Sequence, residues 1–154
     1  NSTKVGNEFI KETVLKENIS FTKIANIYNK YFGDIVPFEK VMKDDKTVFN
    51  EKIQYESITN YKDGYELVVN KNYLVPIINS GVVVFVGEKE GFGNTVIIQG
   101  IDEVDYWYGN VGNLSVSLYD YVSKGGYLGT AQGEKMYLQF RKGNEYLEYN
   151  GFIE

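Results

Sequence analysis

The sequence predicts a mainly β domain, built as a sandwich or flattened barrel and preceded by a short α-helical N-terminal arm. Apolar residues follow a helical spacing as far as residue 32, whereas from Ile53 onward they alternate or run continuously, as in strands. Gly, Asn and Asp turns separate these runs at short intervals, which is typical of all-β domains. We therefore divide the chain into a helical arm and linker, residues 1–50, and a β domain, residues 51–154.

The arm carries two patterns with helical spacing. Residues 7–17 place a few apolar side chains on one side, as in a modest amphipathic helix. Residues 20–32 follow the i, i+3, i+4, i+7 pattern more closely, Ser20 can cap the entry, and Gly33 stands where a left-handed residue ends a helix. Residues 39–52 are polar with little periodicity, so we expect a linker or extended arm there.

The β domain is organised around a predicted hairpin. Val82–Val86 and Thr95–Ile98 are rich in β-branched residues, and the loop between them carries Gly87, Gly91 and Gly93, which supply the positive φ that a hairpin connection needs. The first strand is a continuous apolar run, which predicts that neither of its faces meets water.

Further apolar runs predict the rest of the sheet. We expect strands at 53–58, 65–69, 73–78, 81–87, 94–99, 104–108, 126–130 and 135–141, with another near 146–149. Lys62-Asp63-Gly64, Lys142-Gly143-Asn144 and Lys124-Gly125 predict turns between them.

Composition restricts the possible chemistry. The net charge is −5 with acids and bases interspersed, so we expect no nucleic-acid or anionic-lipid partner. The chain has no Cys and no His, which removes thiol catalysis, thiolate zinc sites and the commonest metal ligand. Ser115 and Ser123 have no base to activate them. Because the chain starts without Met, we expect a fragment of a longer protein.

Two groups of residues invite a functional interpretation. Three acids lie close together, Asp102, Glu103 and Asp105, but such a run just before a strand is more typical of a solvated turn than of a calcium or glycosidase site. Several aromatic residues could line a groove for sugar or peptide, although strand alternation would bury about half of them in the core. They are Tyr106, Trp107, Tyr108, Tyr119, Tyr121, Tyr127 and Tyr137.

Three motifs occur in an order and spacing that resemble a known family. Gly93-Asn-Thr-Val-Ile-Ile-Gln99, Trp107-Tyr-Gly-Asn-Val111 and Tyr127-Leu-Gly-Thr130 look like consecutive motifs of the lysostaphin/LytM-type zinc peptidase domain, which has the duplicated hybrid motif fold. The resemblance covers about residues 60–153 and implies a LytM-type β-sandwich or barrel.

The same resemblance locates the positions of the family's zinc site and catalytic His. His-x-Gly-x-Asp aligns with Lys62 to Glu66, the catalytic His with Asn110, and His-x-His with Tyr137 and Gln139. These residue types are poor zinc ligands or poor proton carriers, so we expect a degenerate domain with no catalytic residue, no metal and no cofactor. We expect Lys62 and Glu66 to form an ordinary ion pair.

A second similarity suggests a biological role. Ile27–Gly33, Val36-Pro37, Val82–Gln99 and Val116–Val122 are similar to the extracytoplasmic part of the stage IV sporulation protein FA family. This resemblance implies a membrane-anchored sporulation regulator that restrains an intramembrane metalloprotease together with other sporulation membrane proteins. It implies a location on the extracytoplasmic side of a bacterial membrane, in the forespore intermembrane space.

Two other functions are compatible with a degenerate LytM domain. One is a sporulation channel component that docks a ring-forming partner. The other is a cell-wall module that contacts peptidoglycan without hydrolysing it. Binding to a soluble ring-forming domain would favour the first of these over the regulator, which should bind membrane-protease components. Binding to isolated peptidoglycan would favour the second.

Overall fold

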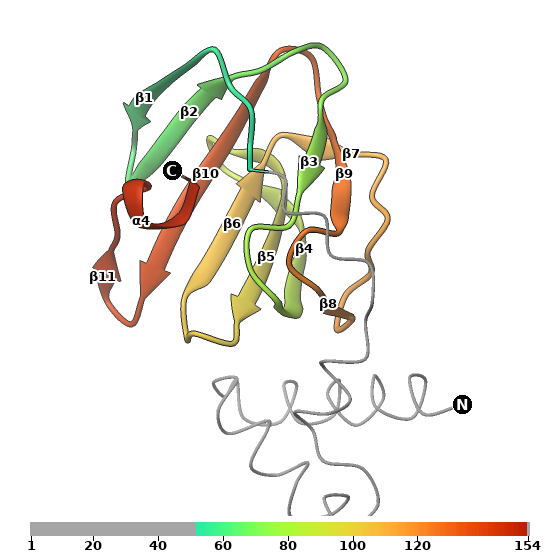
Figure 1. The fold of residues 1–154 in the computed structure, drawn as a ribbon, viewed down its shortest axis with the longest axis vertical. Helices are drawn as coiled ribbons and strands as arrows, with labels where there is room; N and C mark the ends of the chain where they lie inside the picture. Colours follow the sequence, from blue (N-terminus) through green and yellow to red (C-terminus); the bar gives the residue numbers. More distant parts are fainter. Residues whose placement is uncertain (1–51, 154) are drawn as a thin grey trace, which may run out of the picture.

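The computed structural model describes residues 52–153, which are mainly β as expected (Figure 1). The helices expected at 7–17 and 20–32 and the boundary near residue 50 lie outside these residues. The strands are β1 (Ser57–Tyr61), β2 (Gly64–Val68), β3 (Leu74–Pro76), β4 (Gly81–Lys89), β5 (Gly93–Gly100), β6 (Asp105–Gly109), β7 (Val111–Gly112), β8 (Tyr121–Val122), β9 (Tyr127–Ala131), β10 (Lys135–Lys142) and β11 (Glu145–Tyr146), followed by α4 (Asn150–Ile153). Within the described range, no helix is long and apolar enough to span a membrane.

The strands form two antiparallel sheets. The large sheet has the order β1-β2-β10-β6-β5-β4-β8, with β11 added beside β10. The small sheet has the order β3-β9-β7 and stands beside the β4–β6 end of the large sheet in Figure 1. Strand β10 lies in the middle of the large sheet, between β2 and β6, and so brings together segments that are far apart in the sequence.

One hydrophobic core fills the space on the inner side of the large sheet. The alternation of β6 buries Tyr106 and Tyr108, and that of β10 buries Met136, Leu138 and Phe140. The small sheet contributes Val75, Val111, Leu128 and Ala131 to the same cluster. The residues between the buried ones therefore point to the outer face, and the outer face of β10 carries Tyr137 and Gln139.

The central hairpin forms, with two differences from the expectation. Gly87 and Gly93 are not in the turn, because they lie within β4 and β5, opposite Thr95 and Lys89, and the turn consists of residues 90–92. Burial on both faces is found only at the start of β4, whereas Val86 is 38% exposed. The reason is that β8 pairs only with Gly81 and Val82 and leaves the rest of this edge uncovered by any described strand.

The other differences concern the ends of the domain and its short elements. The strand expected at 53–58 begins at Ser57 and runs on to Tyr61, because the Lys62–Asp63 turn pairs Tyr61 directly with Gly64. The strand expected at 146–149 is only the end of β11, and α4 follows it. Strands β7 and β8 were not expected, because each is only two residues long and too short to show a pattern. Phe152 of α4 stacks on Phe140, with ring centroids 4.6 Å apart.

Candidate functional site

The outer face of β2 and β10 brings two of the five predicted positions together. Glu66 lies directly opposite Tyr137 in the β2–β10 register. Burial raises the pKa of Tyr137, and the negative charge of Glu66 raises it further. Glu66 forms its ion pair with Lys135, at 3.4 Å, and not with Lys62 as we expected.

Gln139 lies two residues further along β10, on the same face as Tyr137. It is opposite Trp107 in the β10–β6 register and only 4% exposed. A Cβ at Gly64 would lie 3.0 Å from the Cβ of Gln139 and would collide with the carbonyl oxygen of Leu138. The absence of a side chain at Gly64 thus allows the close approach of β2 and β10 that positions Gln139.

Asn110 has a structural role, because its side chain bonds two backbone carbonyl groups. It has a left-handed backbone, with φ of 59°, between β6 and β7. Its side-chain amide donates to the carbonyl oxygens of Gln132 and Lys135, at 2.9 and 2.8 Å. An amide nitrogen carries two hydrogens, so these bonds use the donor capacity of Asn110 and fasten the connection between β9 and β10.

Lys62 reaches toward the tip of the central hairpin. It occupies the β1–β2 turn with φ of 50°, and a Cβ built on Gly91 would lie 2.8 Å from its Nζ. The Lys62 side chain therefore lies against the β4–β5 turn. The structure thus brings Glu66, Tyr137 and Gln139 onto one face and gives Lys62 and Asn110 other contacts.

An aromatic cluster occupies the same region of the outer face. Tyr61 stacks on Tyr137 with centroids 4.6 Å apart. Phe92 packs edge-on against Tyr61 at 5.7 Å, against Tyr137 at 5.9 Å and against Trp107 at 5.9 Å. We call these four residues the aromatic cluster. They come from β1, the β4–β5 turn, β6 and β10, so the cluster joins four separate segments.

The chain geometry around the cluster depends on glycine and one hydroxyl. The Tyr61 hydroxyl donates to the carbonyl oxygen of Gly91 at 2.6 Å, which fixes the hairpin tip over the cluster. A Cβ at Gly109 would lie 3.0 Å from the Cβ atoms of both Phe92 and Tyr137. Lys89 extends the surface, with its Nζ 4.3 Å from the centre of the Phe85 ring.

The sequence-based interpretation missed half of this cluster. Trp107 and Tyr137 were among the aromatic candidates, whereas Tyr61 and Phe92 were not. Phe92 does carry a signal in the sequence, because it is an aromatic residue between Gly91 and Gly93. In the structure it is only 6% exposed. Tyr106 and Tyr108, also candidates for a groove, are core residues.

The acidic run 102–105 forms a turn held by hydrogen bonds rather than a freely solvated one. Tyr106 donates its hydroxyl hydrogen to Asp102 at 2.5 Å, and the backbone N–H of Val104 donates to the same carboxyl group at 3.2 Å. Burial raises the pKa of Asp105. Neither arrangement resembles a pair of carboxyl groups facing across a cleft.

This fold and the positions on its outer face agree with a known class of protein. Residues 60–149, more than half of the chain, match Peptidase family M23. The chain therefore belongs to peptidase family M23, which confirms the expected family and LytM-type fold. Comparison with curated protein sequences finds no match.

Solved structures with the same fold have low sequence identity. The chain is similar to Csd3 from Helicobacter pylori, at 18% identity and a TM-score of 0.61, with 70% of this chain and 33% of that chain covered. It is also similar to the catalytic domain of the antimicrobial peptidase lysostaphin from Staphylococcus simulans, at 19% identity and a TM-score of 0.54, with 67% and 91% covered. The chain thus spans only about a third of the Csd3 chain.

The residues present do not fit the zinc ion that the LytM resemblance implies. Zinc sites in proteins use imidazole, thiolate and carboxylate groups. Among residues 52–153, no group of three or more His, Cys, Asp and Glu side chains could hold a metal. Glu66 is the single carboxylate at the five positions, and it forms an ion pair with Lys135. We therefore derive no metal chemistry for this site.

Proposed function

We propose that this chain is a non-catalytic M23 domain that acts through protein contacts. The observation that carries the proposal is the aromatic cluster, because stacked rings occupy the face on which the family resemblance locates its zinc ligands. The four residues supply no imidazole, thiolate or carboxylate ligand. The Tyr61 hydroxyl is bonded to the carbonyl oxygen of Gly91, and the raised pKa of Tyr137 keeps its phenol protonated near neutral pH. Shape and apolar contact are what such a face provides.

The further part of the proposal follows the resemblance to the stage IV sporulation protein FA family. In this reading the chain is the extracytoplasmic part of a membrane-anchored sporulation regulator in the forespore intermembrane space. There it helps to restrain an intramembrane metalloprotease. The channel component is the alternative with a soluble, ring-forming partner.

A peptidoglycan-binding module is a second candidate, which one observation favours. Tyr61, Trp107 and Tyr137 are all partly exposed, and aromatic rings at a surface can stack on sugars or contact peptide stems. Lys89 lies 5.4 Å from the centre of the Trp107 ring and brings a positive charge to this surface. A wall fragment would contact this face, not the core.

Metal analysis and a cleavage assay test the proposal that the domain is non-catalytic. In the first, the full chain is dialysed against a buffer that contains zinc, and its metal content is measured. In the second, it is incubated with cross-linked peptidoglycan, with the lysostaphin catalytic domain as an active control. We expect no stoichiometric zinc and no release of peptide fragments. One zinc ion per chain with cleavage above the blank would overturn the proposal.

Binding assays separate the three roles. In sporulating cells, cross-linking of the full-length protein should capture components of a membrane protease if the regulator role is correct. Capture of a soluble ring-forming protein instead would favour the channel role. Co-sedimentation with purified peptidoglycan, lost in Trp107→Ala but kept in Tyr146→Ala, would favour the wall-binding role.

A further inference from the structure

The outer edge of β4 is open beyond Val83. The last contacts with the neighbouring segment are the hydrogen bonds between Val83 and residues 119 and 120, at 2.7 and 2.9 Å. The register of β4 then shifts between Val83 and Phe85, which bends the strand away from β8. From Val84 to Lys89 no strand of residues 52–153 pairs with this edge. An edge of this kind can accept another strand.

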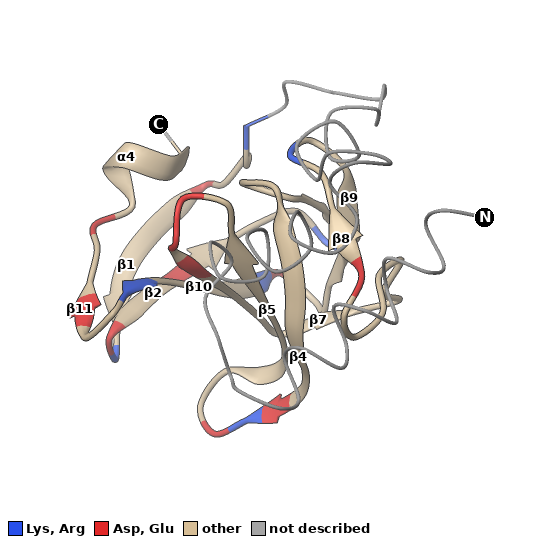
Figure 2. Cartoon of the chain, turned by 90° about the horizontal axis from the view of Figure 1, so that it is seen from below, with Lys and Arg blue, Asp and Glu red and all other residues tan. Residues whose placement is uncertain are grey.

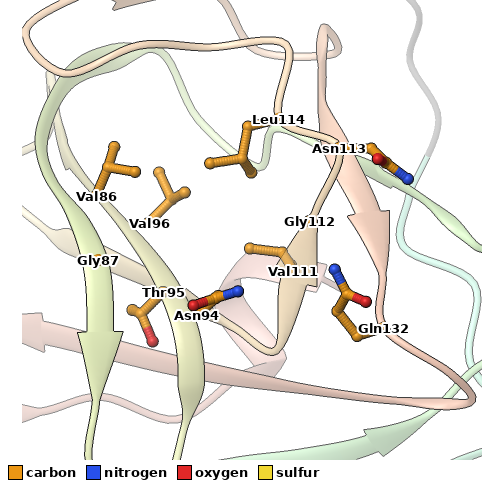
Figure 3. A pocket seen from close by; sticks show the side chains of 10 residues that line it. All are labelled: Val86, Gly87, Asn94, Thr95, Val96, Val111, Gly112, Asn113, Leu114 and Gln132. Atoms are coloured by element: carbon orange, nitrogen blue, oxygen red, sulfur yellow. The ribbon is translucent and has the colours of Figure 1, made fainter.

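A pocket adjoins this open edge. It has a volume of about 400 Å³ and lies between the β4–β5 hairpin and the segment from Val111 to Leu114, as Figure 3 shows. Its apolar side chains are Val86, Val96, Val111 and Leu114, and its polar ones are Asn94, Thr95, Asn113 and Gln132. Val86 belongs both to the open edge and to the pocket, so the two features form one surface.

The charged side chains at the tip of the β4–β5 hairpin indicate which kind of partner segment fits this surface. Alternate residues of a strand share a face, so Glu88 lies on the pocket side with Val86, and both Glu88 and Glu90 are exposed. Lys89 belongs to the opposite side, where its Nζ lies over the rings of Phe85 and Trp107. Figure 2 shows these acidic and basic residues together at the tip of the hairpin. The pocket side of the tip is therefore acidic.

We propose that β4 from Val84 to Lys89, with the adjoining pocket, binds an extended basic segment of a partner protein by strand addition. The segment pairs with the open edge, inserts an aliphatic side chain beside Val86, and places a Lys or Arg opposite Glu88 two residues away. Main-chain bonding supplies affinity and the alternate side chains supply selectivity, as in other strand-addition complexes. The inference rests on the proposed function only in assuming that the chain binds a protein.

Two peptides test this surface on the full 154-residue chain. Each is Thr-rich, about eight residues long, and carries one Ile, followed two positions later by Lys in one peptide and by Glu in the other. We expect the Lys peptide to shift the backbone amide signals of Val84–Lys89 in NMR spectra and to bind roughly fivefold more tightly than the Glu peptide. Glu88→Lys should invert this preference.

Variants of the pocket supply the second readout. Val86→Asp should weaken the Lys peptide about tenfold or more, since it places a charge at the apolar pocket. Ile101→Asp is the matched control, at a residue that is 44% exposed and does not line the pocket, and it should leave binding unchanged. Unchanged amide spectra outside β4 and its neighbours verify that both variants are folded.

Three results would overturn the proposal. They are equal affinity for the two peptides, undiminished binding by Val86→Asp, and shifts confined to the aromatic cluster. Shifts on β4 that depend on protein concentration without peptide would assign the edge to a second copy of the chain and would also overturn it. None of these results bears on zinc content or cleavage, so this inference and the non-catalytic assignment fail separately.

Discussion

Glu66 and Tyr137 face each other across β2 and β10, a carboxylate opposite a phenol in the strand register. Burial is the largest cause that raises the pKa of Tyr137, and the charge of Glu66 adds to it, while Lys135 lowers it. The phenol is therefore protonated at neutral pH. Its carboxylate neighbour is balanced by Lys135 at 3.4 Å, so the pair is a contact between neighbouring strands with its charge compensated.

Glu66→Gln should lower the pKa of Tyr137. The substitution removes the negative charge, which favours the protonated phenol, but it leaves the burial in place. The pKa should therefore fall toward the usual value without reaching it. Titration of the Tyr137 ring by ¹³C NMR measures the change, with exposed Glu56→Gln as the control. An unchanged or higher pKa would contradict the pairing described here.

Phe92→Ala should destabilise the domain by about 3 kcal/mol, because it removes a buried ring that contacts three others. Trp107, the one tryptophan of the chain, reports the loss directly through its fluorescence in urea. Leu74→Ala, at a residue 53% exposed, should change stability by no more than about 0.5 kcal/mol. Similar values for the two variants would mean that the aromatic cluster adds little to stability.

Gly64→Ala should cost roughly 2–4 kcal/mol, since the new methyl group meets the backbone of β10, which cannot move without breaking strand pairing. Gly151→Ala in α4 is the matched comparison. Nothing lies within 4 Å of the Cβ there, so helix propensity should make it neutral or stabilising by about 0.5–1 kcal/mol. Thermal unfolding measures the change in stability of both variants. A Gly64→Ala variant as stable as the original chain would be evidence against the close spacing of β2 and β10.

Alkaline pH should unfold the domain. Burial raises the pKa of Tyr106 and Tyr108 far above the ordinary value of 10.0. These phenols stay protonated in the folded state while the unfolded chain releases protons, so the stability is fully present below about pH 10 and is lost as the pH rises further. Urea unfolding between neutral and strongly alkaline pH measures this fall.

Tyr108→Phe isolates one contribution to that fall. The variant loses the hydrogen bond that the backbone N–H of Ile78 donates to the Tyr108 hydroxyl at 3.0 Å, at a cost of about 1–3 kcal/mol near neutral pH. Above about pH 10 the stability of the variant should fall less steeply than that of the original chain, and the two slopes should differ by about 1.4 kcal/mol per pH unit. Tyr146→Phe, at an exposed ring, serves as the control. An equally steep fall in Tyr108→Phe would contradict the role of its burial.

The long strands could be predicted from sequence because their β-branched runs and alternation are local properties. The ranges of β4, β5 and β10 were close to those expected, whereas β7 and β8 are too short to carry a pattern. The Lys62–Asp63 turn was visible, but the strand before it was misplaced because pairing with Gly64, not composition, determines where β1 lies.

The candidate site was predictable only in part. Strand alternation was enough to place Tyr137 and Gln139 on one face of β10. The ion pair of Glu66 with Lys135 and the stacking of Tyr61 on Tyr137 depend on the β1-β2-β10 order, which arises from long-range pairing. A single sequence does not specify such partners. The expected contact of Glu66 with Lys62 was based on their closeness in the sequence, and it was wrong.

Asn110 also limits which side chains its position can accept. Its amide donates to the carbonyl oxygens of both Gln132 and Lys135. A neutral imidazole has a single N–H and would leave one of those carbonyl groups without its donor. An exchange of this amide for an imidazole would thus loosen the segment between β9 and β10, so any chemistry gained at this position would come with a loss of local order.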